Sequence, residues 1–415
     1  RNAIIWADMR AEQEASNLLE KLDMAHVYRM TGHRLSSSYT GAKLKWIQRH
    51  QPDTYRKTFK VLHAKDYLIF KLTGVFATDY SDASGTNLFD LTGKTWSSEI
   101  IDAWELDAGK LPEPYPSTHV AGYVTRYAAE ETGLAAGTPV VMGGGDGCCA
   151  AVGAGVVSEG DAFNYIGSSS WIAIASNEPV FDPEMKTYTW AHLDPAKYSP
   201  NGTMQAAGAS YQWVRDTLYR EEFQAAKKNG YSVYELMNEE AASSVPGSGK
   251  LIYLPYLMGE RSPRWNPAAR GSFVGLHITH SRADMTRAVL EGVAFNLKIV
   301  LETFRNSGIA IDKIWALGGG AKGKIWRQIL ADIYEAEIRV PHLLDEAPSM
   351  GAAIAGGVGI GLLKDFSAAK IWVRQKDTVL PVSSNVPVYR QMFEMFEKAY
   401  NGLQHVYRDL YQLRH

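Results

Sequence analysis

The sequence predicts an α/β protein with two domains. The chain has 415 residues, which is enough for two domains of ordinary size. Stretches of helical composition alternate with short apolar runs of strand length. Three of those runs end in glycine-rich turns, at 143–147, 167–170 and 318–320. This pattern indicates sheets whose strands are joined to the next element by tight turns.

The composition excludes several classes of protein. Apolar residues make up 46% and charged residues 21%, as in ordinary globular proteins. The formal net charge is −2, so no basic field attracts nucleic acid or anionic lipid. Cys148 and Cys149 are adjacent, which suits neither a disulfide framework nor metal-ligand spacing. The most apolar run, 140–157, is interrupted by glycines and an aspartate. We therefore expect a cytoplasmic protein with no nucleic-acid partner, no membrane span and no metal ligands of its own.

The first third of the chain predicts helices, short strands and turns. The opening run, 1–8, reads as an interior strand with a turn, and the absence of an initiator methionine indicates a chain that has lost its true N-terminus. Residues 12–22 and 41–49 have helical composition. Segment 79–95 is rich in turn residues. Residues 139–142 predict a short buried strand that ends in a glycine-rich turn.

The rest of the chain predicts a hairpin, a strand and several helices. Residues 161–166 and 171–175 have strand composition on either side of a turn, which predicts a β-hairpin. Segment 281–305 predicts a long helix, because Ser281 and Asp284 resemble a capping box. Three further elements are a strand at 313–317, a closely packed helix of small residues at 347–362 and an amphipathic helix at 387–415.

The three glycine-rich turns favour a nucleotide-binding cleft. Glycine permits φ > 0 and lets a ligand approach main-chain N–H groups closely. One such turn only reverses the chain in most proteins, whereas three at strand ends are stronger evidence. None has the G-x-x-x-x-G-K-[ST] spacing of a Walker loop. The turn at 167–170 joins two strands, which suits the actin-like way of holding phosphates.

Asp146 is the residue that most strongly suggests catalysis. It stands at a strand end between glycines, where a carboxylate can reach into a cleft. Phosphoryl transfer to a hydroxyl needs a group that accepts the hydroxyl proton. The alternative is an aspartate that caps the helix starting near Cys148. The spacing alone leaves both interpretations open.

Seven segments carry a more specific pattern, in order and at consistent spacing: 4–10 (IIWADMR), 65–68 (KDYL), 79–86 (DYSDASGT), 143–147 (GGGDG), 165–169 (YIGSS), 254–263 (LPYLMGERSP) and 317–322 (LGGGAK). They resemble the FGGY family of carbohydrate kinases, and within it most closely the xylulose kinases. The resemblance implies two ribonuclease-H-like (actin/hexokinase-like) domains around a cleft, the first lacking its N-terminal part. It places 1–136, completed by 388–415, on the sugar side and 137–387 on the nucleotide side.

The resemblance also implies roles for individual residues. The matches are Asp146 for the catalytic base, Gly167 and Ser168 for the turn facing the ATP phosphates, Gly208 and Gln212 for the nucleotide side of the cleft, Gly320, Ala321 and Lys324 for the adenosine-binding segment, and Ser38 and Asp8 for the sugar pocket. Plainer interpretations remain open for three of them. Gly208 could serve close packing, Gln212 could be an ordinary exposed helix residue, and Lys324 could be a solvated charge.

Two departures from the family pattern bear on the substrate. The family's opening Asp-x-Gly-Thr hairpin, with its magnesium-associated aspartate, and the next motif of the sugar pocket have no counterpart. Gly147 occupies the substrate-binding position where xylulose and glycerol kinases carry an Asn or Gln that contacts the sugar. Gluconate kinases resemble the chain at that point, and 318–340 also resembles kinases of the autoinducer-2 type.

The resemblance implies ATP-dependent phosphorylation of a ketopentose, with conversion of D-xylulose to D-xylulose 5-phosphate as the first expectation. The expected cofactors are ATP and Mg²⁺, and the expected partners are a small-molecule sugar and ATP, with a homodimer as an open alternative to a monomer. Three other functions compete: a kinase for another sugar or sugar acid (gluconate, ribulose or autoinducer-2 type), a non-catalytic sugar or nucleotide sensor, and a chaperone-type ATPase.

Overall fold

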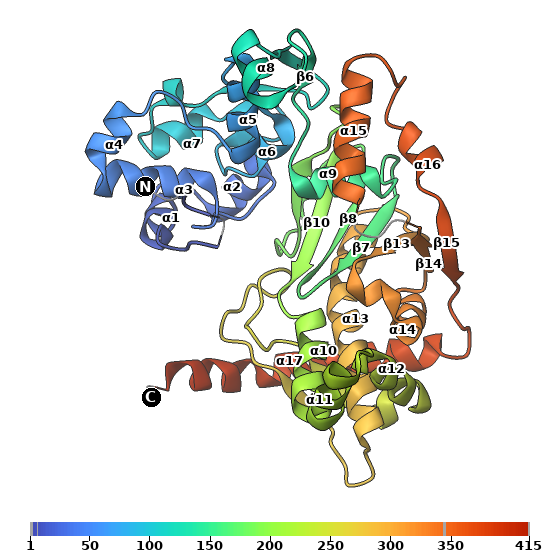
Figure 1. Cartoon of the computed structure of the whole chain (residues 1–415). Helices are drawn as coiled ribbons and strands as arrows, with labels where there is room; N and C mark the ends of the chain where they lie inside the picture. The colour runs from blue at the N-terminus through green and yellow to red at the C-terminus, as the bar shows by residue number, and fades with distance from the viewer. Residues whose placement is uncertain (1–2, 6, 343–345, 414–415) are drawn as a thin grey trace. The chain divides into compact units, whose positions relative to one another are not determined.

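The computed structural model describes residues 3–5, 7–342 and 346–413, and the chain forms two compact units (Figure 1). Unit 1 comprises Arg1–Glu159, Ala175–Pro200 and Glu346–Val373. Unit 2 comprises Gly160–Ile174, Asn201–Asp345 and Arg374–His415. This division groups 137–159 with the first part of the chain and 388–415 with unit 2. The sequence instead suggested that 137–159 belongs to the second domain and that 388–415 completes the first. The domain boundaries at 136/137 and 387/388 stay predictions.

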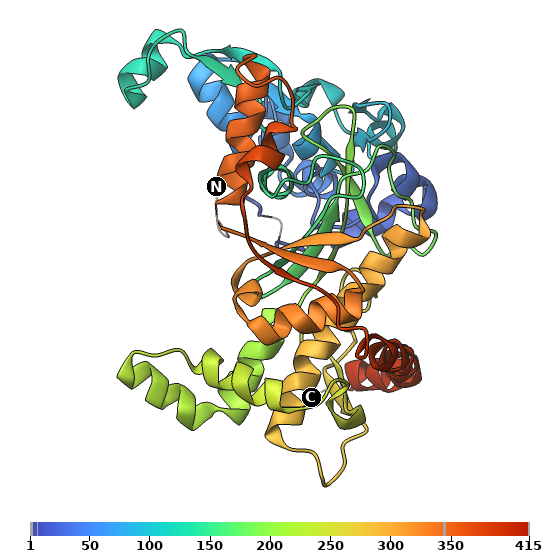
Figure 2. The same cartoon turned by 90° about the vertical axis from the view of Figure 1, so that its right-hand side faces the viewer.

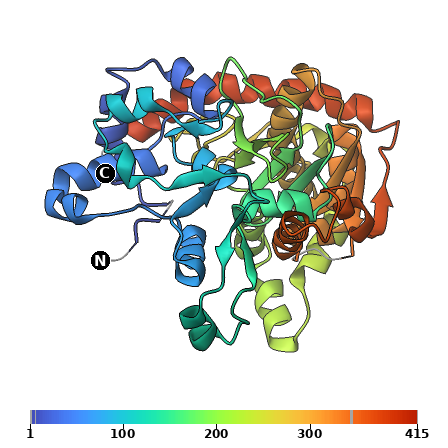
Figure 3. The ribbon, with the colours of Figure 1, turned by 90° about the horizontal axis from the view of Figure 1, so that it is seen from above.

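Unit 1 contains helices and short paired strands. Its helices are α1 (Glu12–Leu18), α2 (Met24–Thr31), α3 (Thr40–His50), α4 (Pro52–Lys57), α5 (Ala64–Thr73), α6 (Tyr80–Ser84), α7 (Ser98–Ala103), α8 (Arg126–Thr132), α9 (Asp146–Gly153), α15 (Ala347–Gly359) and α16 (Ala368–Trp372). Its strands are β1 (Ala77–Asp79), β2 (Phe89–Asp90), β3 (Thr95–Trp96), β4 (Glu113–Tyr115), β5 (Val120–Tyr123), β6 (Pro139–Val141) and β9 (Tyr188–Ala191). Strand β1 pairs in parallel with β4, whereas β5 and β6 pair in antiparallel fashion and lie beside α5 and α8 (Figure 3).

Helices α9 and α15 pack against each other through glycines (Figure 1). A Cβ on Gly153 would lie 1.8 Å from the carbonyl oxygen of Ala347, and one on Gly351 would lie 1.9 Å from that of Cys149. Only glycine lets two helix backbones approach so closely. The predicted helix of small residues is therefore confirmed, and its composition is explained by this contact.

Unit 2 is built on a mixed sheet with strand order β15-β14-β13-β7-β8-β10. Strands β14 (Glu337–Pro341), β13 (Lys313–Leu317) and β7 (Ala162–Ile166) are parallel to one another. Strands β8 (Ser170–Ile174), β10 (Tyr198–Met204, paired through 201–204) and β15 (Gln375–Val379) run antiparallel to their neighbours. The predicted hairpin is confirmed as β7 and β8.

Helices cover this sheet and complete unit 2. The set comprises α10 (Gly208–Leu218), α11 (Arg220–Asn229), α12 (Val233–Ser243), α13 (Arg282–Asn306), α14 (Lys324–Tyr334) and α17 (Val386–Gln412), with the 3₁₀ helix η3 (Gly319–Lys322) and the paired strands β11 (Ile252–Leu254) and β12 (Ser272–Val274). Helices α13 and α14 lie together against one face of the strands (Figure 2). Ser281 caps α13 through the predicted capping box. Helix α17 packs on β11, α13 and α14, because its buried face carries Tyr389, Met392, Phe396, Tyr400 and Tyr407.

The strand predicted at 1–8 is wrong for the residues that the structure describes there. Residues 3–5 have no regular secondary structure, and Ile5 is 61% exposed. An extended apolar run becomes a strand only when another strand pairs with it, and 3–5 and 7–8 have no such partner in the described chain.

Among the described helices, none combines the length and apolar character needed to cross a membrane.

Candidate active site

Asp146 is the first residue of α9, in unit 1. The strand β6 ends at Val141, and the glycines that follow turn the chain into α9. Gly145 occupies the N-cap position, so Asp146 does not cap the helix as an N-cap residue. The Asp146 carboxylate accepts the Gly147 N–H at 2.7 Å and is otherwise exposed to solvent. The side chain is thus accessible at the positive end of a helix, where a carboxylate is stabilised.

Gly147 has open space around its Cβ position. No heavy atom lies within 4 Å of a Cβ built there, and its φ is not in the left-handed region. The backbone therefore admits a side chain at the position where the resemblance implies an amide. In contrast, Cys148 and Cys149 are buried, and burial raises the pKa of Cys149 to about 12. Both act as small core residues.

A partly buried charge cluster lies beneath the turn that carries Asp146. Lys65 Nζ is 2.9 Å from Asp66 Oδ1, 3.1 Å from Asp79 Oδ1 and 3.5 Å from Asp82 Oδ2. Burial opposes the charge on Lys65, but the three carboxylates raise its pKa above the usual value. Burial, with the nearby charge of Asp79, raises the pKa of Asp82 to about 6. Reasoning from the sequence assigned no role to these residues, although the motifs at 65–68 and 79–86 contain all of them.

The structure brings the segments of Asp8 and Ser38 together. Lys43 Nζ donates hydrogen bonds to the carbonyl oxygens of Ile5 and Ser38, each at 2.7 Å. Ser38 Oγ lies 3.0 Å from Ser36 Oγ. Asp8 is paired with Arg10 at 2.6 Å, which lowers the pKa of Asp8 to about 2. The Asp8 carboxylate therefore stays ionised and bound to Arg10, in the same neighbourhood as Ser38.

In unit 2, the turn at 167–170 meets the start of α10. Gly208 N–H donates to the Gly167 carbonyl oxygen at 2.9 Å, and the N–H groups of Ala207 and Ala209 both donate to the Ser168 carbonyl oxygen at 3.0 Å. The turn thereby satisfies the donors that a helix N-terminus leaves free. The Gly167 N–H already donates to the Ser169 carbonyl oxygen at 2.9 Å. Ser168 is exposed, and within the described residues its hydroxyl makes no hydrogen bond.

The turn at 318–320 lies next to the same hairpin. Strands β13 and β7 are parallel, with Leu317 opposite Tyr165, so their carboxyl ends meet at one edge of the sheet. Gly318 has φ of +78°, and a Cβ on Gly320 would lie 2.4 Å from Ile166 Cγ2. Gly319 instead faces open space. The structure therefore brings two of the three predicted turns together, with Gly319 as the accessible glycine of the second.

The remaining residues of the predicted nucleotide site differ in exposure. Gln212 is exposed one helical turn after Gly208, and therefore on the same face of α10. Lys324 is exposed at the first position of α14. Ala321 is fully buried, and its N–H donates to the Gly318 carbonyl oxygen at 3.2 Å, so its contribution is to the shape of the turn.

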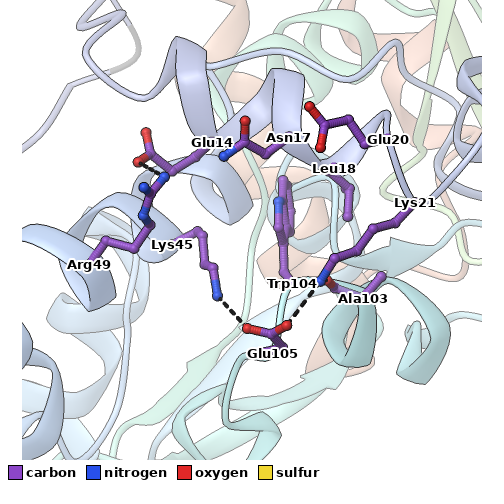
Figure 4. Close-up of a pocket in the computed structure, with 10 residues that line it drawn as sticks. All are labelled: Glu14, Asn17, Leu18, Glu20, Lys21, Lys45, Arg49, Ala103, Trp104 and Glu105. Carbon is purple, nitrogen blue, oxygen red and sulfur yellow. Dashed lines mark hydrogen bonds and ion pairs between the residues drawn. The ribbon is translucent and has the colours of Figure 1, made fainter.

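Unit 1 also contains a pocket away from these residues (Figure 4). Its volume is about 420 Å³, and it is lined by Glu14, Asn17, Leu18, Glu20, Lys21, Lys45, Arg49, Ala103, Trp104 and Glu105. Most of its charges neutralise one another: Glu105 pairs with Lys21 at 2.9 Å and with Lys45 at 3.2 Å, and Glu14 pairs with Arg49 at 3.1 Å. None of the site residues predicted from the sequence lines this pocket.

Comparisons with known proteins match almost the whole chain. The N-terminal domain model of the FGGY family of carbohydrate kinases matches residues 1–153, and the C-terminal domain model matches 162–360. A xylulose kinase of Bacillus subtilis (strain 168) is 32% identical over 402 residues, covering 96% of this chain and 78% of that protein. A gluconokinase of the same strain is 30% identical over 408 residues, covering 98% and 79%. The crystal structure of a ligand-bound xylulose kinase from Lactobacillus acidophilus matches with a TM-score of 0.91 at 26% identity, covering 99% of this chain and 81% of that chain.

Proposed function

The chain belongs to the FGGY family of carbohydrate kinases, and from this premise we propose that it phosphorylates a ketopentose, with D-xylulose as the first substrate to test. Membership makes the protein a kinase that transfers phosphate from ATP to an alcohol group of a sugar. The observation that carries the proposal for this chain is Asp146, an exposed carboxylate at the start of α9 that its glycine neighbours leave accessible.

In the proposed reaction Asp146 acts as the general base. A terminal hydroxyl oxygen of the sugar bonds to the γ-phosphorus of ATP, and the bond from that phosphorus to the β,γ-bridging oxygen breaks, so that ADP leaves. The hydroxyl proton passes to the Asp146 carboxylate. The hydrogen bond from Gly147 N–H occupies one carboxylate oxygen, which leaves the other to receive the proton.

The turns of unit 2 are proposed to hold the nucleotide. The exposed Ser168 hydroxyl is a free donor for a phosphate oxygen, whereas Gly167 contributes through the turn that it shapes, since its N–H is already bonded. Gly208 allows the helix α10 to approach this turn. Gly319 and Gly320 belong to the segment proposed for adenosine, and the open side of Gly319 is the one that a ligand could approach.

We propose Mg²⁺ as the metal that accompanies ATP. The ion is usually held by substrate phosphates, waters and one or two carboxylates. In the parts of the chain that the structure describes, no three His, Cys, Asp or Glu side chains form a group that could hold a metal. Bound to the ATP phosphates, Mg²⁺ would offset negative charge on the transferring group.

Gluconate is the second candidate substrate. The gluconokinase relative is almost as similar as the xylulose kinase, and Gly147 lacks the amide of the xylulose kinases. The test is ADP release by the full-length protein with D-xylulose, D-ribulose, gluconate or glycerol as acceptor. We expect the highest kcat/KM for D-xylulose. A higher value for gluconate or another sugar acid would overturn the substrate assignment and leave the kinase class. The same assay tests the sensor interpretation, which predicts no sugar-dependent ADP release at all.

A further inference from the structure

The motif at 79–86 contains a buried polar network that contacts the turn before Asp146. We propose that Ser81, Ser117 and Asp79 form a clamp that fixes this turn and thereby positions the Asp146 carboxylate. Within this clamp, Ser81 is a positioning residue that acts through Asp146. The inference rests on the proposed role of Asp146 as the base.

One arm of the clamp is Ser81. The Gly145 N–H donates to Ser81 Oγ at 2.9 Å, and Ser81 Oγ donates to Asp79 Oδ2 at 2.5 Å. A hydroxyl has one proton, and an ionised carboxylate can only accept. The Ser81 hydroxyl therefore donates its hydrogen bond to Asp79, and its oxygen lone pairs accept the hydrogen bond from the Gly145 N–H. Gly145 directly precedes Asp146, so this hydrogen bond holds the main chain in place immediately before the proposed base.

The other arm is Ser117. The Gly143 N–H donates to the Ser117 carbonyl oxygen at 2.9 Å. The Ser117 hydroxyl donates to Asp79 Oδ2, also at 2.9 Å. Both ends of the 143–145 turn are thus attached to serines that donate to the same carboxylate oxygen.

The clamp is buried and tightly fitted. Asp79 is 0% exposed, and Ser81 and Ser117 are each 1% exposed. A Cβ on Gly144 would lie 2.9 Å from Ser81 Oγ, and one on Gly145 would lie 3.1 Å from Asp82 Oδ1. The two glycines therefore let the turn rest directly on the network. Because a buried network in a low-dielectric interior is costly to leave half satisfied, it holds one geometry.

Lys65 completes the network electrostatically. Burying a carboxylate without a partner charge has a large free-energy cost. Lys65 Nζ lies 3.1 Å from Asp79 Oδ1, so the lysine charge pairs with one carboxylate oxygen while Oδ2 stays available to the serines. Ser81 N–H adds a further bond to Oδ2 at 2.8 Å. The clamp therefore consists of the Asp79 carboxylate and the two hydroxyl groups that donate to it.

The test compares Ser81→Ala with a matched control, Ser84→Ala, in the full-length protein. Ser84 is also fully buried on α6, and its hydroxyl donates to the Ser81 carbonyl oxygen at 2.8 Å and accepts from Ala191 N–H at 3.1 Å, but it does not bond to the 143–147 turn. Displacement of a catalytic group by about 1 Å can cost ~100-fold in rate. We expect kcat to fall ~10–100-fold in Ser81→Ala with little change in KM, while Ser84→Ala lowers Tm similarly and keeps kcat. Ser81→Thr, which retains the hydroxyl, should recover part of the lost kcat.

A double-mutant cycle with Asp146→Asn separates this inference from the proposed function. If Ser81 acts through Asp146, Ser81→Ala should reduce kcat little further once Asp146 is Asn. An active Asp146→Asn variant would overturn the proposed base. An inactive Asp146→Asn variant together with equal effects of Ser81→Ala and Ser84→Ala would overturn the clamp alone. If Ser81→Ala does not fold, Ser117→Ala removes the other hydroxyl arm, and an unchanged kcat there would equally overturn the clamp.

Discussion

The Gly208 N–H donates to the Gly167 carbonyl oxygen at 2.9 Å, and a Cβ on Gly208 would lie only 2.3 Å from that same oxygen. The start of α10 and the β7–β8 turn are therefore in direct main-chain contact. The contact can form only when residue 208 has no side chain, so the proposed phosphate-binding turn depends on this glycine for its shape.

Gly208→Ala should therefore push α10 away from the turn. Overpacking of this kind costs ~1–3 kcal/mol, and we expect a lower Tm together with a raised KM for ATP. Gly402→Ala is the control, because Gly402 lies within α17 with open space around its Cβ position. Alanine there should stabilise the helix by up to ~1 kcal/mol. Thermal unfolding and ATP titration of both variants check the expectation, which an unchanged ATP KM in Gly208→Ala would contradict.

Gly319→Val tests the adenosine segment without disturbing the fold. A Cβ at Gly319 meets no atom within 4 Å, so valine should leave Tm near the wild-type value while obstructing an approaching nucleotide. We expect a large rise in the KM for ATP with little change in sugar binding. Gly320→Val is a test of packing instead, because its Cβ would lie 2.4 Å from Ile166 Cγ2. A normal ATP KM in well-folded Gly319→Val would move the nucleotide site elsewhere.

Asp146→Asn should abolish most of the activity without unfolding the protein. General-base catalysis typically contributes ~10²–10⁴-fold, and we expect a loss of kcat in this range with ATP binding retained. Asparagine can still accept the Gly147 N–H through its side-chain oxygen. Asp107→Asn is the control, since Asp107 is an exposed aspartate that accepts the Gly109 N–H at 2.9 Å. Steady-state kinetics in which both variants turn over normally would limit Asp146 to a local structural role.

Gly147→Asn should shift substrate preference toward D-xylulose. The open space at Gly147 and its ordinary φ allow the amide to be added without strain. A site with a hydrogen-bonding group discriminates far better among hydroxylated substrates than one without it. We expect kcat/KM for D-xylulose to rise relative to gluconate and glycerol, whereas Gly147→Ala, which adds bulk but no amide, should not change the ratio. Equal ratios in both variants would exclude residue 147 as a determinant of specificity.

Asp82→Asn should change how stability depends on pH. Burial and the charge of Asp79 raise the pKa of Asp82 to about 6, so the fold favours its protonated form. The free energy by which the protonated Asp82 favours the folded state is complete below about pH 4, near the pKa of an aspartate in the unfolded chain. It is lost as the pH rises through 6. We expect Asp82→Asn to match the wild type near pH 4 and to be more stable above pH 6, by ~1–3 kcal/mol. Lys65 still pairs with Asp66 and Asp79 in this variant. Denaturant unfolding at pH 4 to 8 measures the difference, and parallel curves would contradict the expectation.

The elements that the sequence predicted correctly are those with strong local signals. The β7–β8 hairpin follows from two apolar runs around a short turn, and α13 follows from the capping box at Ser281. Helix α17 follows from an apolar stripe of period 3.6. The run at 1–8 carried an equally apolar signal and failed, because a strand depends on a partner that periodicity does not contain.

The sequence by itself determined the family, the position of Asp146 after a strand and the glycine turns, because these depend on residue types at fixed spacing along the chain. Only the tertiary structure decided what each glycine does. It assigned Gly208 and Gly320 to packing and left Gly147 and Gly319 open, since a Cβ clash depends on atoms far away in sequence. It also joined Ser81 and Ser117 through Asp79 beneath the turn. Such a network exists only when chain folding brings its hydroxyls within hydrogen-bonding distance of one buried carboxylate.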